Sequence, residues 1–514
     1  MREKLFTIGS RIVKYLFYFL FLLTFYYAIT SPNLILGDNS VTGAGTTMYT
    51  TVFIIAAVVI FICFFTYESF MDFVKFIFID NRLKTSLIIF GLTIIWQLIF
   101  MLNVHPAIGF DAGALHQALF DPNNAEMRGY YSLNPNNTPV MLLQHQLALL
   151  FHTRSWLFFD FVSLFLVDIS AIFNFLSVKF IDVKKVPLAI YLHSLWLMVF
   201  PMIIVPYTDT WVLPFVSLYI LFYIMLRYGK FSWKLKIPVA ALMGMTVIFA
   251  YFIKPSAIVG FIAIALIEVL YIFKGKWQPD KAINEFIFLL IVIIGMVPTY
   301  MITNHAIEHE KYIQVNTSRS IPPIHFISMG VSGEGGYNAN DALMMAKLPN
   351  RKAQVAYSKK KLKQRIKKMG PVGYVKFLFM KHRNNSADGT FAWVKEGHFL
   401  RGNTNPSSKG FRGQLRNFVY LYGKYLGDFR YIAQVWWVFF LAVIAFNWHD
   451  NRKIVQTLRL AIIGGFMFLL IFEGGRSRYL IQFLPAMLIL ASLSIENSWN
   501  WFKGLFAWVD TDKK

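Results

Sequence analysis

Long apolar runs constrain this chain more than any other feature of its sequence. A helix needs about 20 apolar residues to cross the hydrocarbon core of a bilayer, and such runs recur along all 514 residues. Hydrophobic residue types make up 56% of the chain, which excludes an ordinary soluble globular protein. We expect about twelve spanning helices. They lie at residues 12–30, 50–68, 85–103, 156–178, 187–205, 210–227, 237–253, 256–273, 286–303, 431–449, 457–473 and 479–497.

The first apolar run follows a basic end, as the core of a signal peptide does. It is long, however, and lacks a clean small-residue cleavage site, so we predict a retained first helix. The single cysteine, Cys63, lies within the second run, and the sequence therefore offers no intrachain disulfide. The fold class that follows is an all-α polytopic membrane protein.

Short basic loops predict which helix ends face the cytoplasm, because such loops are retained on that side. They agree with one another, and with cytoplasmic termini, only if residues 104–155 stay outside. The apolar stretch 139–151 is then too short to span, and we expect a juxtamembrane helix with Thr138 as N-cap and Pro139 in its first turn. A true short crossing is the alternative, and it would place the basic loops outside. These loops are residues 75–84, 179–185, 227–236, 274–281 and 447–453.

A second polar region, residues 304–430, is long enough to form a small α-rich exterior domain. It has 22 Lys and Arg against 7 Asp and Glu, a net charge of +15 out of +23 for the whole chain. Residues 359–368 (KKKLKQRIKK) predict a basic helix, whereas residues 328–340 and 402–410 are rich in turn formers. The membrane core is accordingly divided into residues 1–303, which include the exterior loop 104–155, and residues 431–514, which end in a short cytoplasmic tail.

The basic composition of this region has two interpretations. One is a solvated face with no partner. The other is attraction to anionic lipid or to an anionic envelope polymer, worth roughly 1 kcal/mol per Lys or Arg close to a charged membrane surface. Nucleic acid is not an expected partner on the outer side of a membrane.

Ionisable residues from four segments are predicted to lie at the same outer end. Each alone is compatible with a solvated helix end, and Asp209 equally with a helix cap. Their common side favours a site in which a carboxylate removes an acceptor's proton while cations hold the charge of a departing phosphate. The residues are Asp111, Asp209, Lys254, Glu473, Arg476 and Arg478.

Short motifs around these residues resemble the GT-C superfamily of membrane glycosyltransferases, over most of residues 85–495. Its members share a polytopic core, a first large exterior loop with a catalytic acidic residue and juxtamembrane helices, and a polyprenyl-phosphate sugar donor. Two further strings, GGYN (335–338) and ADGTFAW (387–393), resemble those of a Gram-positive bacterial branch. The other motifs are FD (110–111), YYSLNPNN (130–137), YTD (207–209), KP (254–255) and RSRY (476–479), with Pro485 beyond.

The resemblance implies an inverting glycosyltransferase at the outer membrane face, with Asp111 as the general base. Arg476, Arg478 and Lys254 would hold the donor's phosphate, since an arginine fork can grip two phosphate oxygens. The expected partners are the lipid donor and a cell-envelope acceptor, for which a teichoic acid, a polysaccharide, a glycolipid and a protein are all compatible. The other residues implied to contact substrate are Asp209, Glu473, Tyr131 and Asn136.

Two features depart from the superfamily. Asp111 is followed by Ala112, where many members have a second acidic residue, and two apolar runs precede the helix of the loop, where the family core begins with one. No DxD or His/Asp pair stands beside Asp111, so a divalent metal is possible but not indicated, and no cofactor is expected.

Two other classes of function stay open. A transporter or flippase of a lipid-linked solute usually shows inverted repeats with matching broken helices, whereas Lys254 and Pro255 break one apolar run without a counterpart. A structural membrane scaffold would not depend on any single exterior carboxylate.

Overall fold

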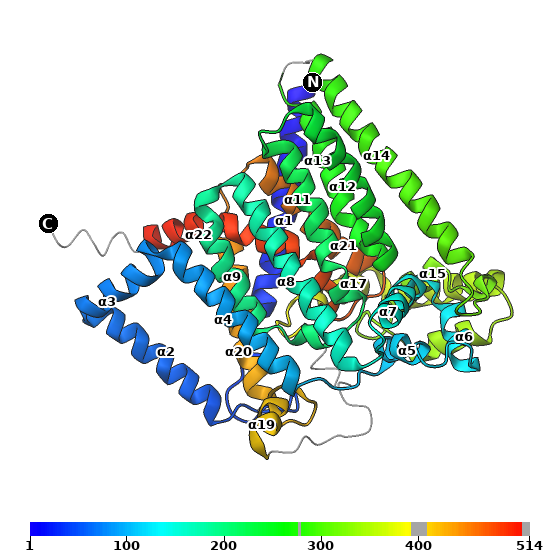
Figure 1. Cartoon of the computed structure of the whole chain (residues 1–514), viewed down its shortest axis with the longest axis horizontal. Coiled ribbons are helices and arrows are strands. Elements are labelled where there is room, and N and C mark those ends of the chain that lie inside the picture. Colours follow the sequence, from blue (N-terminus) through cyan, green and yellow to red (C-terminus); the bar gives the residue numbers. More distant parts are fainter. Residues whose placement is uncertain (276–278, 392–408, 506–514) are drawn as a thin grey trace.

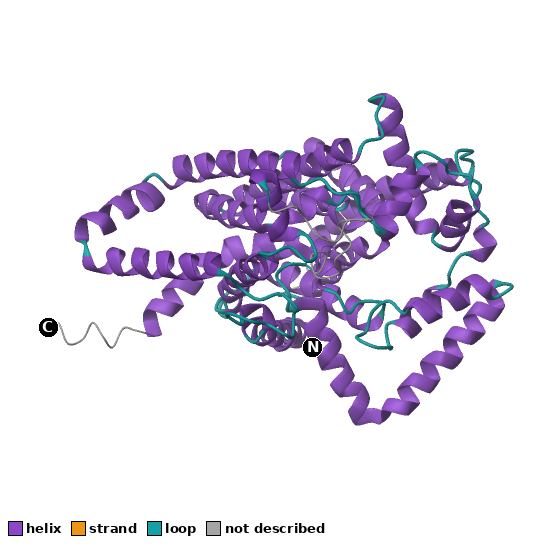
Figure 2. Cartoon of the chain, turned by 90° about the horizontal axis from the view of Figure 1, so that it is seen from below, coloured by secondary structure: helices purple, strands orange, loops and turns teal. Residues whose placement is uncertain are grey.

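The computed structural model describes residues 1–275, 279–391 and 409–505, and in this range the chain forms helices and loops without a strand (Figures 1 and 2). Eleven segments of the described chain are long and apolar enough to cross a membrane. The predicted all-α polytopic class is confirmed. The helices of these segments are α1 (Arg2–Ile29), α2 (Met48–Thr66), α4 (Arg82–Asn103), α8 (Trp156–Ile181), α11 (Leu213–Tyr228), α12 (Trp233–Ile253), α13 (Ile258–Ile272), α14 (Pro279–Glu308), α20 (Leu426–Ala445), α21 (Lys453–Ile471) and α22 (Leu484–Leu505).

The run expected to span at 187–205 forms a shorter helix, α9 (Val186–Val199), which packs against α4, α8 and α22. Phe200 leaves the helix in an extended conformation, and a 3-10 turn at Pro201–Ile204 follows. A residue before proline is pushed toward extended geometry, so Pro201 ends the helix one turn early. The count of long spans is therefore eleven where the sequence suggested about twelve.

The spans differ widely in how deeply they are buried. The segment that ends in α22 is 83% buried over its most apolar window, and α22 packs against α8, α9, α20 and α21. The window in α2 is 6% buried, and Figure 1 shows α2 standing away from the bundle beside α3 (Glu68–Lys75). Lipid tails are as apolar as leucine, so an uncovered apolar helix is expected in a membrane protein.

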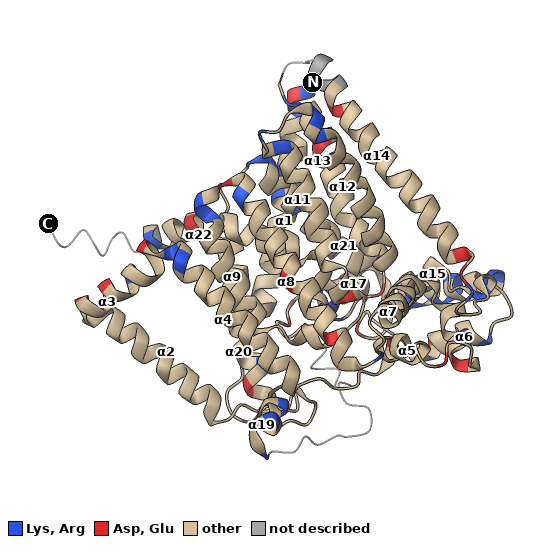
Figure 3. Ribbon diagram, in the orientation of Figure 1, with Lys and Arg blue, Asp and Glu red and all other residues tan. Residues whose placement is uncertain are grey.

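Figure 3 shows Lys and Arg along one edge of the bundle, from the N-terminus past α13 and α11 to the start of α4. A second set lies on the opposite side, near α15 (Pro323–Met329) and α19 (Gly410–Val419). The ends of the helices therefore separate into two charged layers with apolar helix between them.

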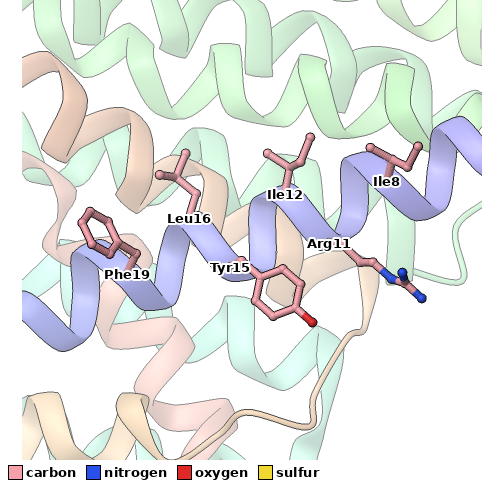
Figure 4. A pocket seen from close by; sticks show the side chains of 6 residues that line it. All are labelled: Ile8, Arg11, Ile12, Tyr15, Leu16 and Phe19. Carbon is pink, nitrogen blue, oxygen red and sulfur yellow. The ribbon is translucent and has the colours of Figure 1, made fainter.

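The exposed face of α1 is apolar along its length. Figure 4 shows Ile8, Ile12 and Leu16 projecting from one side of this helix, while Tyr15 and Arg11 project from the other. The three aliphatic side chains are exposed, and Phe19 continues the surface. Together these side chains line a shallow hollow on the surface of α1. The hollow suits contact with lipid rather than a reaction, because its lining has one charged side chain and no carboxylate.

Helix α14 joins the bundle through α12, and glycines bring the two backbones together. A Cβ added at Gly244 would collide with the carbonyl oxygen of Val292, and one added at Gly295 would collide with that of Ala241. Small residues allow such close approach between membrane helices.

The loop at 104–155 contains three short helices, as expected for the juxtamembrane elements: α5 (Phe110–Ala118), α6 (Ala125–Leu133) and α7 (Thr138–Leu150). Helix α7 has 13 residues and packs against α5 and α12. Its N-cap is Asn137 rather than Thr138. The predicted cap is off by one residue because a 3-10 turn, Pro135–Asn137, leads directly into the helix.

The region 304–430 contains α15, α19, α16 (Ala339–Lys347) and the 36-residue α17 (Arg351–Ser386). The predicted basic helix at 359–368 lies within α17, whereas most of the loop predicted at 402–410 lies outside the described residues. Helix α17 packs against α1 and α21, and α19 packs against α4 and α20. The remaining short elements are α10 (Thr208–Trp211), a π-turn at Phe76–Asp80 and 3-10 turns at Pro32–Leu34, Val183–Lys185, Pro255–Ala257, Thr317–Arg319 and Ser477–Phe483.

Candidate functional site

Asp111 lies in the first turn of α5 and is partly exposed. The helix starts abruptly, because Phe110 has a positive φ of 52° and Gly109 is extended. Such a backbone is strained for a phenylalanine, and strain of this kind tends to occur at functional sites. The position is also electrostatically suited to an anion, since the N-terminal end of a helix carries partial positive charge.

A chain of hydrogen bonds links Asp111 to two other segments. The hydroxyl of Tyr130 in α6 donates to Asp111 Oδ1 at 2.7 Å, and Asn137 Nδ2 donates to that hydroxyl at 2.6 Å. Tyr207, which precedes α10, donates to Asn137 Oδ1 at 3.5 Å. Burial, reinforced by the charge of Asp111, raises the pKa of Tyr130 well above its ordinary value, so this hydroxyl stays protonated and keeps donating.

Asp209 and Lys254 form an ion pair between α10 and the break that follows α12. Lys254 is extended because Pro255 follows it. Asp209 is 1% exposed, and its second carboxyl oxygen, Oδ2, has no hydrogen-bond partner among the described residues. Asp209 makes no capping hydrogen bond at α10, so the alternative of a helix cap is not what the structure shows.

A third group of charges follows α21, around the ring of Tyr479. The Tyr479 hydroxyl donates to Glu473 Oε1 at 3.1 Å and accepts from Arg478 Nη2 at 3.0 Å. Lys254 Nζ lies 5.4 Å from the centroid of this ring, which connects the group to the ion pair with Asp209. Burial raises the pKa of Glu473 above its ordinary value, against the opposing charge of Arg478.

These groups lie close enough for their charges to act on one another. Besides burial, Asp111, Asp209 and Arg478 all influence the pKa of Tyr207, which is raised well above its ordinary value. The charges of Asp111 and Arg476 also act on Glu473. The structure thus brings together six residues that the sequence placed in four separate segments: Asp111, Asp209, Lys254, Glu473, Arg476 and Arg478.

A buried lysine fixes the loop that carries Glu473. Lys381 of α17 is fully buried, and its Nζ donates to the carbonyl oxygens of Gly330 at 2.6 Å, Leu470 at 3.1 Å and Phe472 at 2.6 Å. Burial lowers the pKa of Lys381 to about 8. Because all three acceptors are backbone oxygens, the ammonium joins the end of α21 to the loop after α15.

The contact between these two loops depends on glycine. The amide of Gly474 donates to the carbonyl of Gly335 at 3.0 Å, and a Cβ at Gly336 would lie 2.6 Å from the carbonyl oxygen of Gly474. Gly475 has a φ of 73°, which a larger residue rarely adopts. The GGYN motif therefore packs directly on the segment that presents Glu473 and Arg476.

Tyr337 of the same motif is a candidate that the sequence did not single out as a site residue. Its side chain is 56% exposed, yet partial burial and the charges of Asp111 and Glu473 raise its pKa. It therefore lies at the border between the charged cluster and solvent. Its place in a turn-rich loop far along the chain gave no signal of this proximity.

Two residues implied to bind substrate are placed beside the cluster rather than in it. Tyr131 is fully buried, and its hydroxyl donates to the carbonyl of Ala114 at 3.4 Å. Asn136 is exposed and bonds to the side chain of its neighbour Asn137. Their neighbours Tyr130 and Asn137 form the hydrogen-bond chain instead: Tyr130 donates to Asp111, and Asn137 donates to Tyr130. Consecutive positions of a helical turn point about 100° apart, so adjacent residues face different surroundings.

The histidines of the first loop make aromatic contacts. His116 stacks on Trp156 at a centroid distance of 3.9 Å, and His145 stacks on Tyr312 at 3.5 Å. Across the described ranges, no three His, Cys, Asp or Glu side chains are grouped as metal ligands.

The ADGTFAW motif joins α17 to its neighbours in the part that the structure describes. Asp388 Oδ1 accepts hydrogen bonds from Asn33 Nδ2 at 3.1 Å and from the amide of Thr390 at 2.9 Å. Gly389 packs against Trp437 of α20. The last two residues of the motif, including Trp393, lie outside the described residues.

Comparison with known proteins gives a family and no activity. No curated protein matches the chain, and no solved structure does either. A family model described as "conserved hypothetical integral membrane protein" matches residues 5–499, nearly the whole length. The chain belongs to this family of integral membrane proteins.

Proposed function

We propose that this protein is an inverting membrane glycosyltransferase that takes a sugar from a polyprenyl-phosphate donor. The observation that carries the proposal is the meeting of three carboxylates and three cations, from four segments, at one end of the bundle. Asp111 and Glu473 are partly exposed, so a ligand can reach them.

Arg476 and Arg478 are suited to hold the donor's phosphate. Both lie beside Glu473, and the guanidinium of Arg478 stands 4.8 Å from the ring centroid of Tyr479. Guanidinium groups bind phosphate through parallel hydrogen bonds that strengthen as charge builds on the leaving group. Lys254, already paired with Asp209, adds a further positive charge beside the same ring.

Asp111 is suited to act as the general base. In the transfer, the acceptor hydroxyl gives its proton to the Asp111 carboxylate while its oxygen bonds to the anomeric carbon. The bond between that carbon and the phosphate oxygen breaks, and the electron pair leaves with the phosphate toward the arginines. The hydrogen bond from Tyr130 fixes one carboxyl oxygen at 2.7 Å, which orients the other for the acceptor.

The cluster is proposed to face the outside of the cell. The edge that Figure 3 shows with Lys and Arg near the N-terminus, α13 and α11 is the opposite end of the spans. Short basic loops are retained in the cytoplasm, which supports this orientation. Helix α7 is also too short to cross a bilayer, in agreement with an exterior loop 104–155.

The test is transfer by an Asp111→Asn variant in reconstituted membranes, with a radiolabelled sugar on polyprenyl phosphate and cell-envelope acceptors. We expect transfer to fall by roughly 10²- to 10⁴-fold, the contribution of a positioned base. Asp121→Asn is the matched control, because Asp121 is an exposed carboxylate of the same loop. Near wild-type transfer by Asp111→Asn would refute the assignment of the base, and absence of donor binding by the wild type would refute the enzyme.

A transporter or flippase is the second candidate, and one observation favours it. Asp160 lies fully buried in α8, and neither carboxyl oxygen has a hydrogen-bond partner in the described structure. Ionisable groups inside a membrane often belong to a solute or proton path. Under this alternative Asp160→Asn would abolish movement of the lipid-linked solute, whereas under the proposed transferase it leaves sugar transfer intact in detergent.

A further inference from the structure

The segment from residue 342 to residue 387 has an extreme charge composition. It contains 13 Lys and Arg and no Asp or Glu. Most of these residues lie in α17, whose two halves are divided by Gly370, with φ 65° and ψ 177°, and by Pro371. The two halves have different surfaces, and the difference indicates different surroundings.

The first half of α17 carries five of its lysines on one exposed face. Four residues of the lysine stripe, as we name it, are spaced by seven, four and four positions, and the fifth lies seven positions before the last, so all five fall on one side of the helix. At a rise of 1.5 Å per residue it extends over about 22 Å. The residues of the lysine stripe, all exposed, are Lys352, Lys359, Lys360, Lys363 and Lys367.

The opposite face of this half holds the helix in place. Gln354 and Ser358 are buried there, and Arg365 pairs with Asp341 of α16 at 2.7 Å. The Arg365 guanidinium also donates to the carbonyl of Ser328 at 2.8 Å. The lysine stripe is therefore presented by a helix that is anchored from behind, and its like charges repel one another unless an anionic partner lies between them.

The surface of the first half fits a polymer in water better than a membrane. An interfacial helix needs an apolar face to insert between lipids, and in residues 351–369 the exposed large apolar side chain is Ile366. Beyond the kink, Val372, Val375 and Phe379 are exposed, so the second half has the surface that lipid would cover. A shallow hollow along the stripe, lined by Lys359, Leu362, Lys363, Ile366 and Lys367, is open to solvent.

The same helix leads to the charged cluster. Fourteen residues after Lys367, Lys381 grips the loop that presents Glu473, and Asn385 Oδ1 accepts the amide of Gly475 at 2.5 Å. The two halves of α17, joined at the kink, thus carry the lysine stripe and fix the loop of the candidate site. A chain bound along the stripe is held by the element that positions Glu473.

We infer that the lysine stripe is the docking surface for the acceptor, and that the acceptor is a linear polyanion with repeated phosphate or carboxylate groups. This inference rests on the proposed function, because an acceptor exists only if the protein transfers a sugar. A neutral polysaccharide would gain nothing from five aligned ammonium groups, whereas a chain of regularly spaced anions releases counterions along its length when it binds.

The binding test uses fluorescent inorganic polyphosphate and, separately, fluorescent neutral dextran with full-length protein in nanodiscs of phosphatidylcholine. The variant Lys359→Gln, Lys360→Gln, Lys363→Gln, Lys367→Gln removes four charges from the stripe. The matched control removes four exposed lysines from the opposite edge of the bundle: Lys179→Gln, Lys184→Gln, Lys230→Gln, Lys234→Gln.

We expect polyphosphate to bind the wild type and the control within twofold of each other, and the stripe variant at least tenfold more weakly and with a smaller dependence on salt. Equal binding by the stripe variant and the control would overturn the inference, and so would equal binding of dextran and polyphosphate. In nanodiscs that contain phosphatidylglycerol, the stripe variant can instead bind this anionic lipid more weakly than the wild type while its affinity for polyphosphate is unchanged. That result would identify the membrane as the partner and refute the inference.

A transfer assay separates this inference from the proposed function. Loss of transfer to an anionic envelope polymer in the stripe variant, with transfer to a short soluble acceptor retained, supports both. Undiminished transfer to the polymer by the stripe variant overturns the docking surface and leaves the enzyme standing. Stripe-dependent binding without any transfer by the wild type refutes the enzyme, and with it the role of the polymer as acceptor.

Discussion

Two charged clusters lie at opposite ends of the span Thr208–Tyr228, about 27 Å apart along the helix axis. At one end Arg227 donates to Glu285 Oε1 at 2.7 Å and pairs with Glu268 at 2.8 Å, while Lys453 pairs with Glu268 at 2.6 Å. At the other end Asp209 is likewise paired with a lysine, Lys254, but tyrosine hydroxyls donate to the remaining two carboxylates, Asp111 and Glu473.

The two clusters differ in the hydrogen-bond donors that hold their carboxylates. A carboxylate held directly by Arg or Lys has its charge neutralised within the protein, which suits a structural joint. A carboxylate held by a neutral hydroxyl keeps its charge and its basicity. The first arrangement fastens helices together, whereas the second leaves a carboxylate able to take up a proton.

The largest expected effect is on stability, at the Arg227 end. Replacing Arg227→Met leaves Glu285 and Glu268 partly buried with fewer cations, so we expect the protein to be destabilised by roughly 3 kcal/mol. Thermal unfolding in detergent measures this. Lys75→Met is the control, because both side chains of its pair with Asp72 are exposed, and surface pairs contribute about 0–1 kcal/mol. Equal melting temperatures of the two variants would break the comparison.

The second effect is on donor binding, at the Asp111 end. Arg476→Ala combined with Arg478→Ala removes two charge-assisted donors, each worth about 1.5 kcal/mol at the lower end of the usual range. Affinity for a fluorescent polyprenyl-phosphate analogue should therefore fall by roughly 100-fold, while the melting temperature changes less than in Arg227→Met. Arg412→Ala with Arg416→Ala in α19 controls for general loss of positive charge. Unchanged donor affinity in the first variant would refute the phosphate role.

The sequence predicts the spans and the end of the bundle at which charged side chains lie, but it does not predict contacts made through backbone oxygens. The spans follow from their apolar runs, and the meeting of Asp111, Asp209 and Arg478 at one end follows from counting crossings along the chain. The hydrogen bond from Lys381 to the carbonyl oxygen of Phe472 joins residues 91 positions apart. Its acceptor is a backbone oxygen, which every residue possesses. Nothing in the residue types near Phe472 marks it as an acceptor, so this contact could be found only in the fold.

The position of the tyrosine beside Asp111 shows a finer limit of sequence reasoning. Tyr130 and Tyr131 are identical and adjacent, and only the orientation of α6 decides which one meets the carboxylate. The early end of α9, in contrast, had a signal in the sequence. Pro201 stood in the sequence as a signal, but the apolar run continued through it and hid the break.

The variant Tyr130→Phe tests whether the single hydroxyl that donates to Asp111 matters for transfer. It removes the donor to Asp111, and we expect the transfer rate to fall by about tenfold, because a hydrogen bond to a charged group contributes roughly 1.5 kcal/mol or more. Tyr131→Phe is the matched control, since that hydroxyl donates to a backbone carbonyl in the core. A larger fall in the transfer rate of Tyr131→Phe than of Tyr130→Phe would show that Tyr131, and not Tyr130, assists Asp111.

The smallest expected effect is a pH dependence of donor binding that comes from Glu473. Because burial raises the pKa of Glu473, part of this carboxyl stays protonated at pH values where an exposed glutamate is ionised. As the pH rises through that pKa, a negative charge appears beside Arg476 and Arg478 and competes with the phosphate of the donor. The donor is a phosphate diester and keeps one charge over this range, so affinity should fall several-fold toward higher pH.

The variant Glu473→Gln is neutral at every pH and should bind donor tightly without this fall. Glu334→Gln, an exposed glutamate of the neighbouring loop, should keep the wild-type profile. If affinity for the polyprenyl-phosphate analogue declines equally with pH in Glu473→Gln and in the wild type, another group titrates, and Glu473 belongs with the neutralised carboxylates at the Arg227 end.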